Sequence, residues 1–217
     1  MELQDAINQR HSIRQFTDKP VEKKMITKIV ELAQRAPSWV NSQPWQVYCA
    51  MGDTLQEIKN AYRDQDIAGN QGDSDLPVMS REDWAPQTQD NMKQWRHGIV
   101  HHFANFDEAH EKMTNASNTL YDSPVILYIT IPKASPDWSI FDAGLFAENI
   151  MLAATAYGLG TIPTYNSVRF PAILHQTLNV PDDERFIVGI SLGYSANTTI
   201  NSYNSERRPV NEILHFN

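Results

Sequence analysis

IFDAGLFAENIMLAATAYGL, from Ile140 to Leu159, is a long and almost uninterrupted apolar stretch. Only Asp142, Glu148 and Asn149 break its apolar character, and such groups are costly in a lipid bilayer. The stretch therefore predicts a helix that is buried in protein on nearly every side, not a membrane span. In a domain of this size, such a helix either lies at the centre or packs against a second subunit.

Periodicity and turn residues place further elements on both sides of this helix. Ser139 with Asp142 resembles a capping box at its start, and Gly158 with Gly160 closes it. Asp53 is the expected N-cap of an earlier helix. Helices outnumber strands and mix with them, so we expect an α+β fold. The other predicted helices span residues 2–10, 21–35, 53–62, 88–116 and 171–178, and the predicted strands span 46–51, 124–131 and 186–192.

The length of 217 residues fits a single domain over 1–217. Residues 64–90 are polar and contain glycine, which predicts an irregular insertion and a candidate mobile lid, and residues 205–217 form a C-terminal extension. The N-terminus has neither a basic region nor an apolar core of a signal peptide, so a cytoplasmic protein without a membrane anchor is expected.

The charge and cysteine content exclude several classes of function. A formal net charge of -8 and a pI near 5.3 argue against nonspecific nucleic-acid binding, which depends on neutralising phosphates. The one cysteine, Cys49, excludes an intrachain disulfide and a cysteine-based metal site. It lies in an apolar run, so we expect an inert thiol in the core.

A basic cluster near the N-terminus suits a phosphate. Within RHSIR, residues 10–14, two guanidiniums, an imidazole and a hydroxyl fall within five positions. Arginine presents a planar fork of donors to phosphate oxygens and stays charged. Arg207 and Arg208 supply further positive charge from another segment. The alternative is that these residues are surface groups at a helix end, where positive charge is favourable in any case.

A second segment suits a flat ring with polar edges. APSWVNSQPW, residues 36–45, offers a hydroxyl and two carboxamides beside prolines and indoles. Ser38 and Asn41 are also common turn residues, but turn chemistry does not account for Gln43. The polar run 161–167 after the buried helix is placed to present backbone donors along a ring edge. One ligand with a phosphate and a heteroaromatic ring would satisfy both segments.

Two other patterns point to chemistry that we discount. His97 and His101 lie four residues apart, but no glutamate stands between them in the metalloprotease position, so a solvated helix face is the expected arrangement. GISLG, residues 189–193, matches the letters of a nucleophile elbow but falls in a predicted strand with no helix after it. We therefore predict no metal site and no catalytic side chain.

Taken together, these segments resemble the FMN-dependent nitroreductase family. The first family pattern is met by Arg10, Ser12, Arg14 and Phe16, and the second is met in full from Ala36 to Trp45. The Asp142-x-Gly144 helix with Glu148-Asn149, the Gly-Leu-Gly turn at 158–160 and Arg208-Pro209 also match, and the resemblance covers the chain outside roughly 64–120. It implies a nitroreductase-like fold with a central, mostly antiparallel sheet flanked by helices, assembled as an intertwined homodimer.

The resemblance also assigns a cofactor site for FMN. It implies that the phosphate is bound by Arg10, Ser12, Arg14 and Arg207, with His11 alongside and Arg208 sharing the role of Arg207. It implies that Pro37, Ser38, Trp39, Asn41 and Gln43 line the flavin ring, partly from the other subunit. Pro163, Thr164, Tyr165 and Asn166 fall where the family sets a backbone N–H near flavin N5. Several members have Glu-Gly at the last two of these positions, so only a backbone role carries over.

The implied activity is reduction of nitroaromatic or quinone-type acceptors with NADH or NADPH, by ping-pong hydride transfer through flavin N5. Such a cycle needs no essential acid or base on the protein, because the flavin carries the redox chemistry. Alternatives are a flavin reductase, dehalogenase or ring-fragmenting oxygenase on the same fold, a non-catalytic flavin-binding module, and a hydrolase with a metal at His97 and His101. An aromatic slot for a small aromatic acceptor is predicted from Trp39, Tyr165, Phe103, Phe106 and the Trp84 region.

Overall fold

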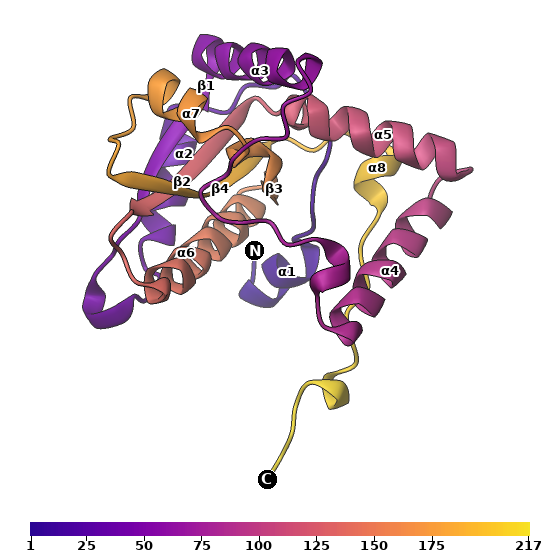
Figure 1. Ribbon diagram of the computed structural model, residues 1–217. Coiled ribbons are helices and arrows are strands. Elements are labelled where there is room, and N and C mark those ends of the chain that lie inside the picture. The colour runs from indigo at the N-terminus through magenta and orange to yellow at the C-terminus, as the bar shows by residue number, and fades with distance from the viewer.

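A computed structural model of the chain describes residues 1–217 and has a four-stranded sheet between layers of helices (Figure 1). The strands lie in the order β1 (Gln46–Met51), β2 (Val125–Pro132), β4 (Glu184–Gly193) and β3 (Gly160–Thr164), and every neighbouring pair is antiparallel. The predicted α+β class is confirmed. The sequence-based prediction missed β3, which contains Pro163; an edge strand tolerates proline because only one side of its backbone is paired.

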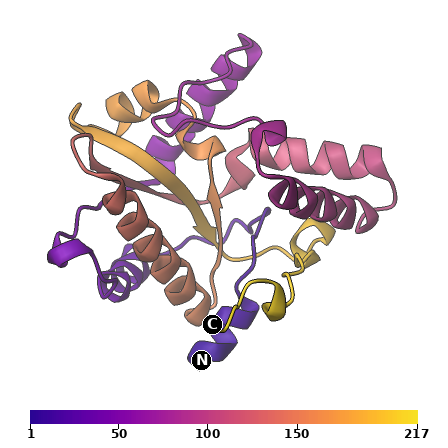
Figure 2. The ribbon, with the colours of Figure 1, turned by 60° about the horizontal axis from the view of Figure 1, so that its bottom comes forward.

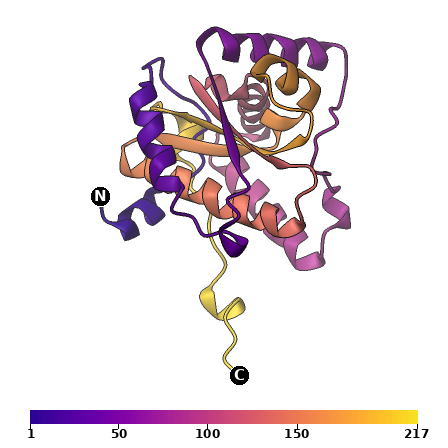
Figure 3. The ribbon, with the colours of Figure 1, turned by 90° about the vertical axis from the view of Figure 1, so that its left-hand side faces the viewer.

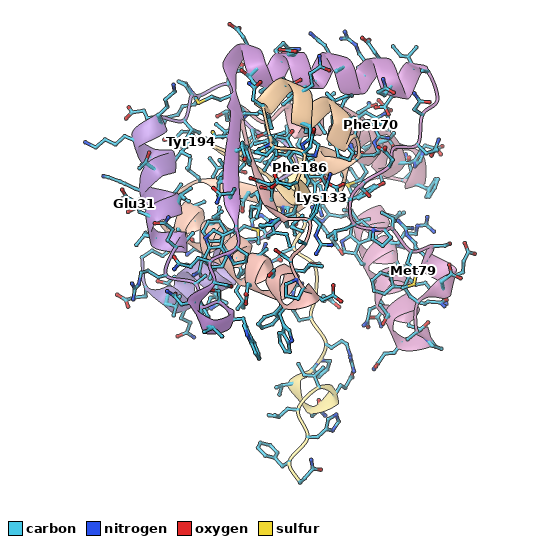
Figure 4. All side chains as sticks on the ribbon, turned by 60° about the vertical axis from the view of Figure 1, so that its left-hand side comes forward. Glu31, Met79, Lys133, Phe170, Phe186 and Tyr194 are labelled. Atoms are coloured by element: carbon cyan, nitrogen blue, oxygen red, sulfur yellow. The ribbon has the colours of Figure 1, made fainter.

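The alternating side chains of β2 divide the core into two parts. Leu127 and Ile129 join the cluster that packs on α2 (Lys23–Ala33) and α6 (Asp137–Ala156). Tyr128 joins the cluster that packs on α3 (Gly52–Ile67) and α7 (Pro171–Leu178). Phe170 and Phe186 also lie in this second cluster, beneath α3 and α7 (Figure 4). The sheet is therefore covered on both faces, as Figure 3 shows from the side.

Helix α6 lies against the sheet on one face, but within one chain it is not buried on nearly every side, because Trp138 and Phe141 are more than half exposed. Its start also differs from the expected capping box. The helix begins at Asp137 after Pro136, and Ser139 is buried inside its first turn. Asp142 does not cap the helix; its carboxylate accepts a hydrogen bond from the Trp39 N–H at 3.0 Å. The helix ends before Gly158, which adopts φ +76° as a C-terminal glycine should.

Gly160 does not take part in ending α6, in contrast to the prediction. It begins β3, and a Cβ there would stand 2.6 Å from the Ile13 side chain. Its small size lets the segment around Ser12 and Ile13 lie against the edge of the sheet. Ser12 forms a parallel bridge with Thr161, and the Ile13 N–H donates to the Thr161 carbonyl at 3.0 Å.

The predicted helix over 88–116 is a hairpin of two helices, α4 (Pro86–His101) and α5 (Phe106–Asn118). Asn105 breaks the run, because its side chain accepts from the Glu108 N–H and caps α5. Phe103 is buried with Ile99 and Ile200 between the hairpin and the short helix α8 (Thr199–Ser202). Figure 2 shows the hairpin beside the sheet with the yellow α8 next to it.

The insertion is irregular between α3 and α4 apart from a turn at Arg81–Asp83, and its first part is fastened to the body. Asp66, at the end of α3, pairs with Arg169 at 2.5 Å. The Asp73 N–H donates to the Arg169 carbonyl at 3.0 Å, and Asp75 accepts from the Phe186 N–H at 2.7 Å. Met79, farther along, lies near α4 (Figure 4). Mobility of this segment stays a prediction.

Other boundaries also differ from expectation. Helix α1 covers Leu3–Gln9. Met51 stands at the N-cap position of α3 without a side-chain hydrogen bond, and Asp53 lies within the first turn. Cys49 is exposed on the edge strand β1 and is not a core thiol. The tail beyond α8 projects from the body (Figures 1 and 3), and Phe216 near its end is 91% exposed. No helix combines the length and apolar composition that crossing a bilayer requires.

Candidate functional site

The N-terminal basic segment and the C-terminal segment meet in one small pocket. Residues 10–14 run along the outer edge of β3, and α8 with the chain that follows it closes over them. The space that they enclose is about 30 Å³. Arg10, His11, Ser12, Arg14, Tyr203, Ser205 and Arg207 line it.

Arg14 is a buried cation that no carboxylate neutralises. It is 8% exposed, and its guanidinium donates only to the Ser12 carbonyl, at 3.2 Å. None of the ion pairs in the molecule includes it. Burial lowers the pKa of Arg14, although Tyr121 and Tyr203 act in the opposite direction. Because a buried charge is normally paired, this guanidinium is a candidate site for an anion.

The surrounding groups add positive character to the pocket. His11 lies between two carbonyl oxygens, with Nδ1 2.8 Å from that of Gln9 and Nε2 2.9 Å from that of Asn201. Both ring nitrogens therefore face main-chain carbonyl oxygens of the chain itself. Arg207 bonds only to oxygens of Ser205 and Glu206, which leaves its charge available to a ligand.

Arg10 and Arg208 are less available than Arg14 and Arg207. Arg10 approaches Glu148 of α6 at 3.7 Å, although it still lines the pocket. Arg208 pairs with Glu212 at 3.1 Å and is not among the residues that line the pocket.

The predicted ring-edge residues lie at the far end of β3 from the basic segment. Ser12 bridges Thr161, and Thr164 ends the strand three residues later, which is about 10 Å along an extended chain. Tyr165 is 45% exposed. The Asn166 side chain donates to the Ser117 carbonyl at 2.6 Å and its N–H to Thr164 Oγ1 at 3.0 Å. The main-chain N–H of Asn166 and one N–H of its carboxamide are therefore engaged within the chain.

The second motif, residues 37–43, lies elsewhere on the molecule. Its loop is anchored to Asp142 of α6 through the Trp39 N–H, whereas Arg10 approaches Glu148. Asp142 and Glu148 are about 9 Å apart along the helix axis and about 120° apart around it. Figures 1 and 2 likewise show the loop after α2 away from α1 and α8. One chain alone does not unite the two motifs.

The loop holds a strained backbone. Val40 has φ +50°, Asn41 +59° and Gln43 +45°. Asparagine tolerates this region, but a β-branched residue there is a genuine outlier. The Gln43 N–H donates to Ser38 Oγ at 2.9 Å and closes the turn. Strain of this kind persists where the surroundings enforce it, and it gathers at functional sites.

Replacing Val40 with asparagine should relieve this strain. Val40 is 87% exposed, so little packing is lost. We expect the free energy of unfolding to rise by about 1 kcal/mol, which raises the melting temperature by roughly 2–4 °C. Thermal unfolding checks this, with Val47→Asn on β1 as the control that lowers stability. A fall in Val40→Asn would contradict the strain argument.

The predicted aromatic slot is not assembled within one chain. Phe103 is buried between the hairpin and α8, and Phe106 stacks on His110 with centroids 5.8 Å apart. Instead, Trp39 stacks on Trp138 at 5.4 Å. Trp138 meets Phe141 edge-on at 6.0 Å. Trp39, Trp138 and Phe141 are 60%, 56% and 58% exposed, and they form an aromatic patch beside the strained loop.

Alternative sites are poorer candidates. The rings of His97 and His101 stack at 3.8 Å, and His101 Nδ1 bonds to the His97 carbonyl at 2.8 Å, so the pair does not converge on a metal. GISLG lies within β4 with Ser191 buried, which rules out a nucleophile elbow there. A shallow depression of about 460 Å³ beside α7 has mixed charges, and its Lys133 already donates to the Asp182 carbonyl.

The family model described as the Nitroreductase family matches residues 7–194 of the chain. The chain belongs to the nitroreductase family. The 4-nitrobenzoate reductase of Pseudomonas putida is 29% identical over 215 residues, which cover 97% of this chain and 93% of that enzyme. The chloronitrobenzene nitroreductase of Comamonas testosteroni is 30% identical over 222 residues, which cover 99% of this chain and 96% of that enzyme.

A solved nitroreductase structure confirms the fold. The FMN and NADPH-dependent nitroreductase NfnB from Sphigopyxis sp. strain HMH is 22% identical, with a TM-score of 0.91 over 100% of this chain and 99% of that one. The nitroreductase-like arrangement of sheet and helices is therefore shown for this chain.

Sequence reasoning missed the groups that complete this nitroreductase's arginine pocket. Tyr203 and Ser205 line it, and Tyr121 lies close enough to influence Arg14. Asn201 binds the backbone of the basic segment. These residues lie in unremarkable polar stretches, and no local spacing connects them with residues almost two hundred positions earlier.

Proposed function

We propose that this nitroreductase is an FMN-dependent oxidoreductase that uses NADH or NADPH to reduce nitroaromatic or quinone-type acceptors. The observation that carries the proposal is Arg14, a buried guanidinium without a carboxylate partner, in one pocket with Arg10, His11 and Arg207. The names of the similar enzymes from Pseudomonas putida and Comamonas testosteroni support a nitroaromatic acceptor. The description of the similar structure supports FMN and NADPH.

The residues of the pocket fit the phosphate of FMN. Arg10, Arg14 and Arg207 would supply charge and forked donors, and the hydroxyl of Ser12 would complete the cradle, with the imidazole of His11 alongside. Ser12 lies beside Thr161, and β3 runs from there to Thr164. This distance suits the sugar-alcohol chain of the cofactor. Pro163, Thr164, Tyr165 and Asn166 would flank the ring from this side.

The chain's own residues bind, orient and exclude water, and none needs to act as an acid or base. FMN, when bound, supplies the capacity to take a hydride from a nicotinamide and deliver it to an electron-poor acceptor. The protein's contribution is to hold the phosphate end through the arginines and to leave one ring face open near Tyr165. Tyr165 is partly exposed and offers an apolar ring surface for an aromatic substrate.

We further propose that the protein works as a homodimer whose two sites each combine both chains. The loop of Pro37, Ser38, Trp39, Asn41 and Gln43 lies away from the arginine pocket of its own chain, so it would line the flavin of the partner. Large apolar side chains are exposed on α1, α6 and the tail, which is the composition of a subunit interface. These are Leu3, Ile7, Trp138, Phe141, Val210, Ile213, Leu214 and Phe216.

The absorption spectrum and turnover of the purified protein test the function. We expect a yellow protein that releases FMN on denaturation, and whose bound flavin is bleached anaerobically by NADPH or NADH. Addition of 4-nitrobenzoate, nitrobenzene or a quinone should restore the yellow colour with multiple turnovers. Free FMN and a halogenated phenol serve as the acceptors for a flavin reductase and a dehalogenase.

Each other outcome selects a different function. Rapid turnover with free FMN or the halogenated phenol alone would contradict the nitroreductase activity and leave the flavin site standing. A bound flavin that neither nicotinamide reduces would point to a non-catalytic flavin-binding module. A colourless protein that does not bind added FMN would contradict the whole proposal.

A further inference from the structure

We infer that Asn201 is a positioning residue that sets the geometry of the phosphate-binding segment. The inference rests on the proposed FMN function, because the segment it holds contains Arg14. Asn201 lies on α8 and is 4% exposed. It is not one of the residues that line the pocket. It would therefore act through Arg14 and His11, not through the ligand itself.

The Asn201 carboxamide binds the main chain of the basic segment on both of its polar atoms. Its Oδ1 accepts from the Arg14 N–H at 2.7 Å and from the Gln15 N–H at 3.1 Å. Its Nδ2 donates to the Gln15 carbonyl at 2.6 Å. The side chain thus binds the main chain of Arg14 and Gln15 in the way that a neighbouring β-strand would. These bonds fix the backbone at Arg14 and with it the direction of the Arg14 side chain.

The same residue joins the basic segment to the C-terminal segment. Asn201 Nδ2 also donates to the Ala196 carbonyl at 2.9 Å and approaches Ser195 Oγ at 3.2 Å. Its own carbonyl is the acceptor for His11 Nε2 at 2.9 Å. One buried residue therefore holds Arg14, His11 and the chain that leads to Arg207 in a common frame.

Only a carboxamide meets both demands of this position. Two main-chain N–H groups need an acceptor, while the Nδ2 hydrogens point at the carbonyl oxygens of Ala196 and of Gln15, the latter also accepting from the Ala196 N–H at 3.1 Å. Aspartate keeps the acceptor but would place a second oxygen against those two carbonyls. Alanine leaves the N–H groups of Arg14 and Gln15 without their acceptor, and unsatisfied buried groups of this kind are costly.

The position of the hairpin adds a second constraint on α8. His102 Nε2 bonds to Ser202 Oγ at 2.9 Å and to the Thr199 carbonyl at 3.1 Å. Gly98 leaves room for the Tyr203 hydroxyl, which a Cβ there would meet at 2.6 Å. The hairpin therefore braces α8 from outside while Asn201 fixes the basic segment from inside.

The test compares FMN with riboflavin, which has the same ring system but lacks the phosphate. For Asn201→Asp and Asn201→Ala, we expect the apoprotein's dissociation constant for FMN to rise about tenfold or more. The dissociation constant for riboflavin should change less than twofold. A misplaced phosphate cradle changes the ratio of the two constants, whereas general destabilisation weakens both ligands in parallel.

Asn179→Ala is the matched control. Asn179 ends α7 in the left-handed conformation at φ +53° and lies outside the arginine pocket. Its replacement should lower the melting temperature and leave the ratio of the FMN and riboflavin constants unchanged. If Asn201→Ala does not fold, Asn201→Asp and the milder Ser195→Ala, which removes one partner of Nδ2, carry the comparison.

The outcomes separate this inference from the function on which it rests. A parent protein that prefers FMN to riboflavin, together with Asn201 variants that keep the same preference, would overturn the positioning role alone. Parallel loss of both ligands would also overturn it and indicate a purely structural residue. A parent protein that does not prefer FMN would overturn the phosphate assignment, and the role of Asn201 with it.

Discussion

Replacement of Arg14 with methionine is expected to weaken FMN binding about a hundredfold. The guanidinium is buried, so its bonds to a phosphate would form in a site of low dielectric constant, where charge-assisted bonds are strong. A hydrogen bond to a charged group contributes about 1.5–3 kcal/mol, and each 1.4 kcal/mol changes a dissociation constant tenfold. Loss of two such bonds therefore gives an effect of at least this size.

The same substitution should stabilise the FMN-free protein. Arg14 is held away from water with no carboxylate beside it, and methionine of similar length removes the cost of burying the charge. We expect the free energy of unfolding to rise by about 1 kcal/mol, which corresponds to roughly 2–4 °C in melting temperature. Function and stability thus change in opposite directions, as is common at binding sites.

Flavin titration of apoprotein and thermal unfolding without flavin measure the two effects. Arg35→Met is the matched control, because Arg35 lies exposed just beyond α2 and should change neither quantity. An Arg14→Met protein that retains FMN as tightly as the parent would refute the phosphate assignment. A large loss of stability without flavin would refute the view that Arg14 is an unneutralised charge.

Local sequence predicted those elements whose signals lie within the element itself. The strand over 46–51 and the helix over 171–178 match β1 and α7, because a short apolar run and a proline in the first turn are local features. β3 was missed because its five residues acquire strand structure only by pairing with β4. The sequence predicts one helix over 88–116 because helix-forming residues continue on both sides of Asn105. The break depends on a single capping side chain, that of Asn105.

The candidate site also contains both residues that local sequence predicts and residues that it does not. Residues 10–14 carry their chemistry in five consecutive positions, so the sequence alone indicated a phosphate cradle. Asn201 carries no such signal, because its importance comes from main-chain partners about 187 positions away. The tertiary fold creates that contact when β4 returns the chain beside β3 and the basic segment. The loop at 37–43 poses a different problem, because its position makes sense only beside a second chain.

Mixed dimers should show directly that each site draws on both chains. Arg14→Met and the double variant Asn41→Ala/Gln43→Ala are each expected to lose FMN retention and turnover as homodimers. In a two-fold dimer with shared sites, a mixed dimer carries both defects at one site and neither defect at the other. After unfolding and refolding an equal mixture, half of the dimers are mixed, so about a quarter of all sites should be intact.

Differently tagged chains allow the mixed dimers to be isolated, where about half of the parent's turnover and FMN content should return. If the loop served its own chain, every site of a mixed dimer would carry one defect, and no activity would return. The placement of the two motifs within one chain favours the shared arrangement, because the loop and the arginine pocket approach α6 at Asp142 and Glu148, on different sides of the helix. An inactive mixed dimer, or a protein that stays monomeric, would therefore contradict the shared site while leaving the arginine pocket of each chain in place.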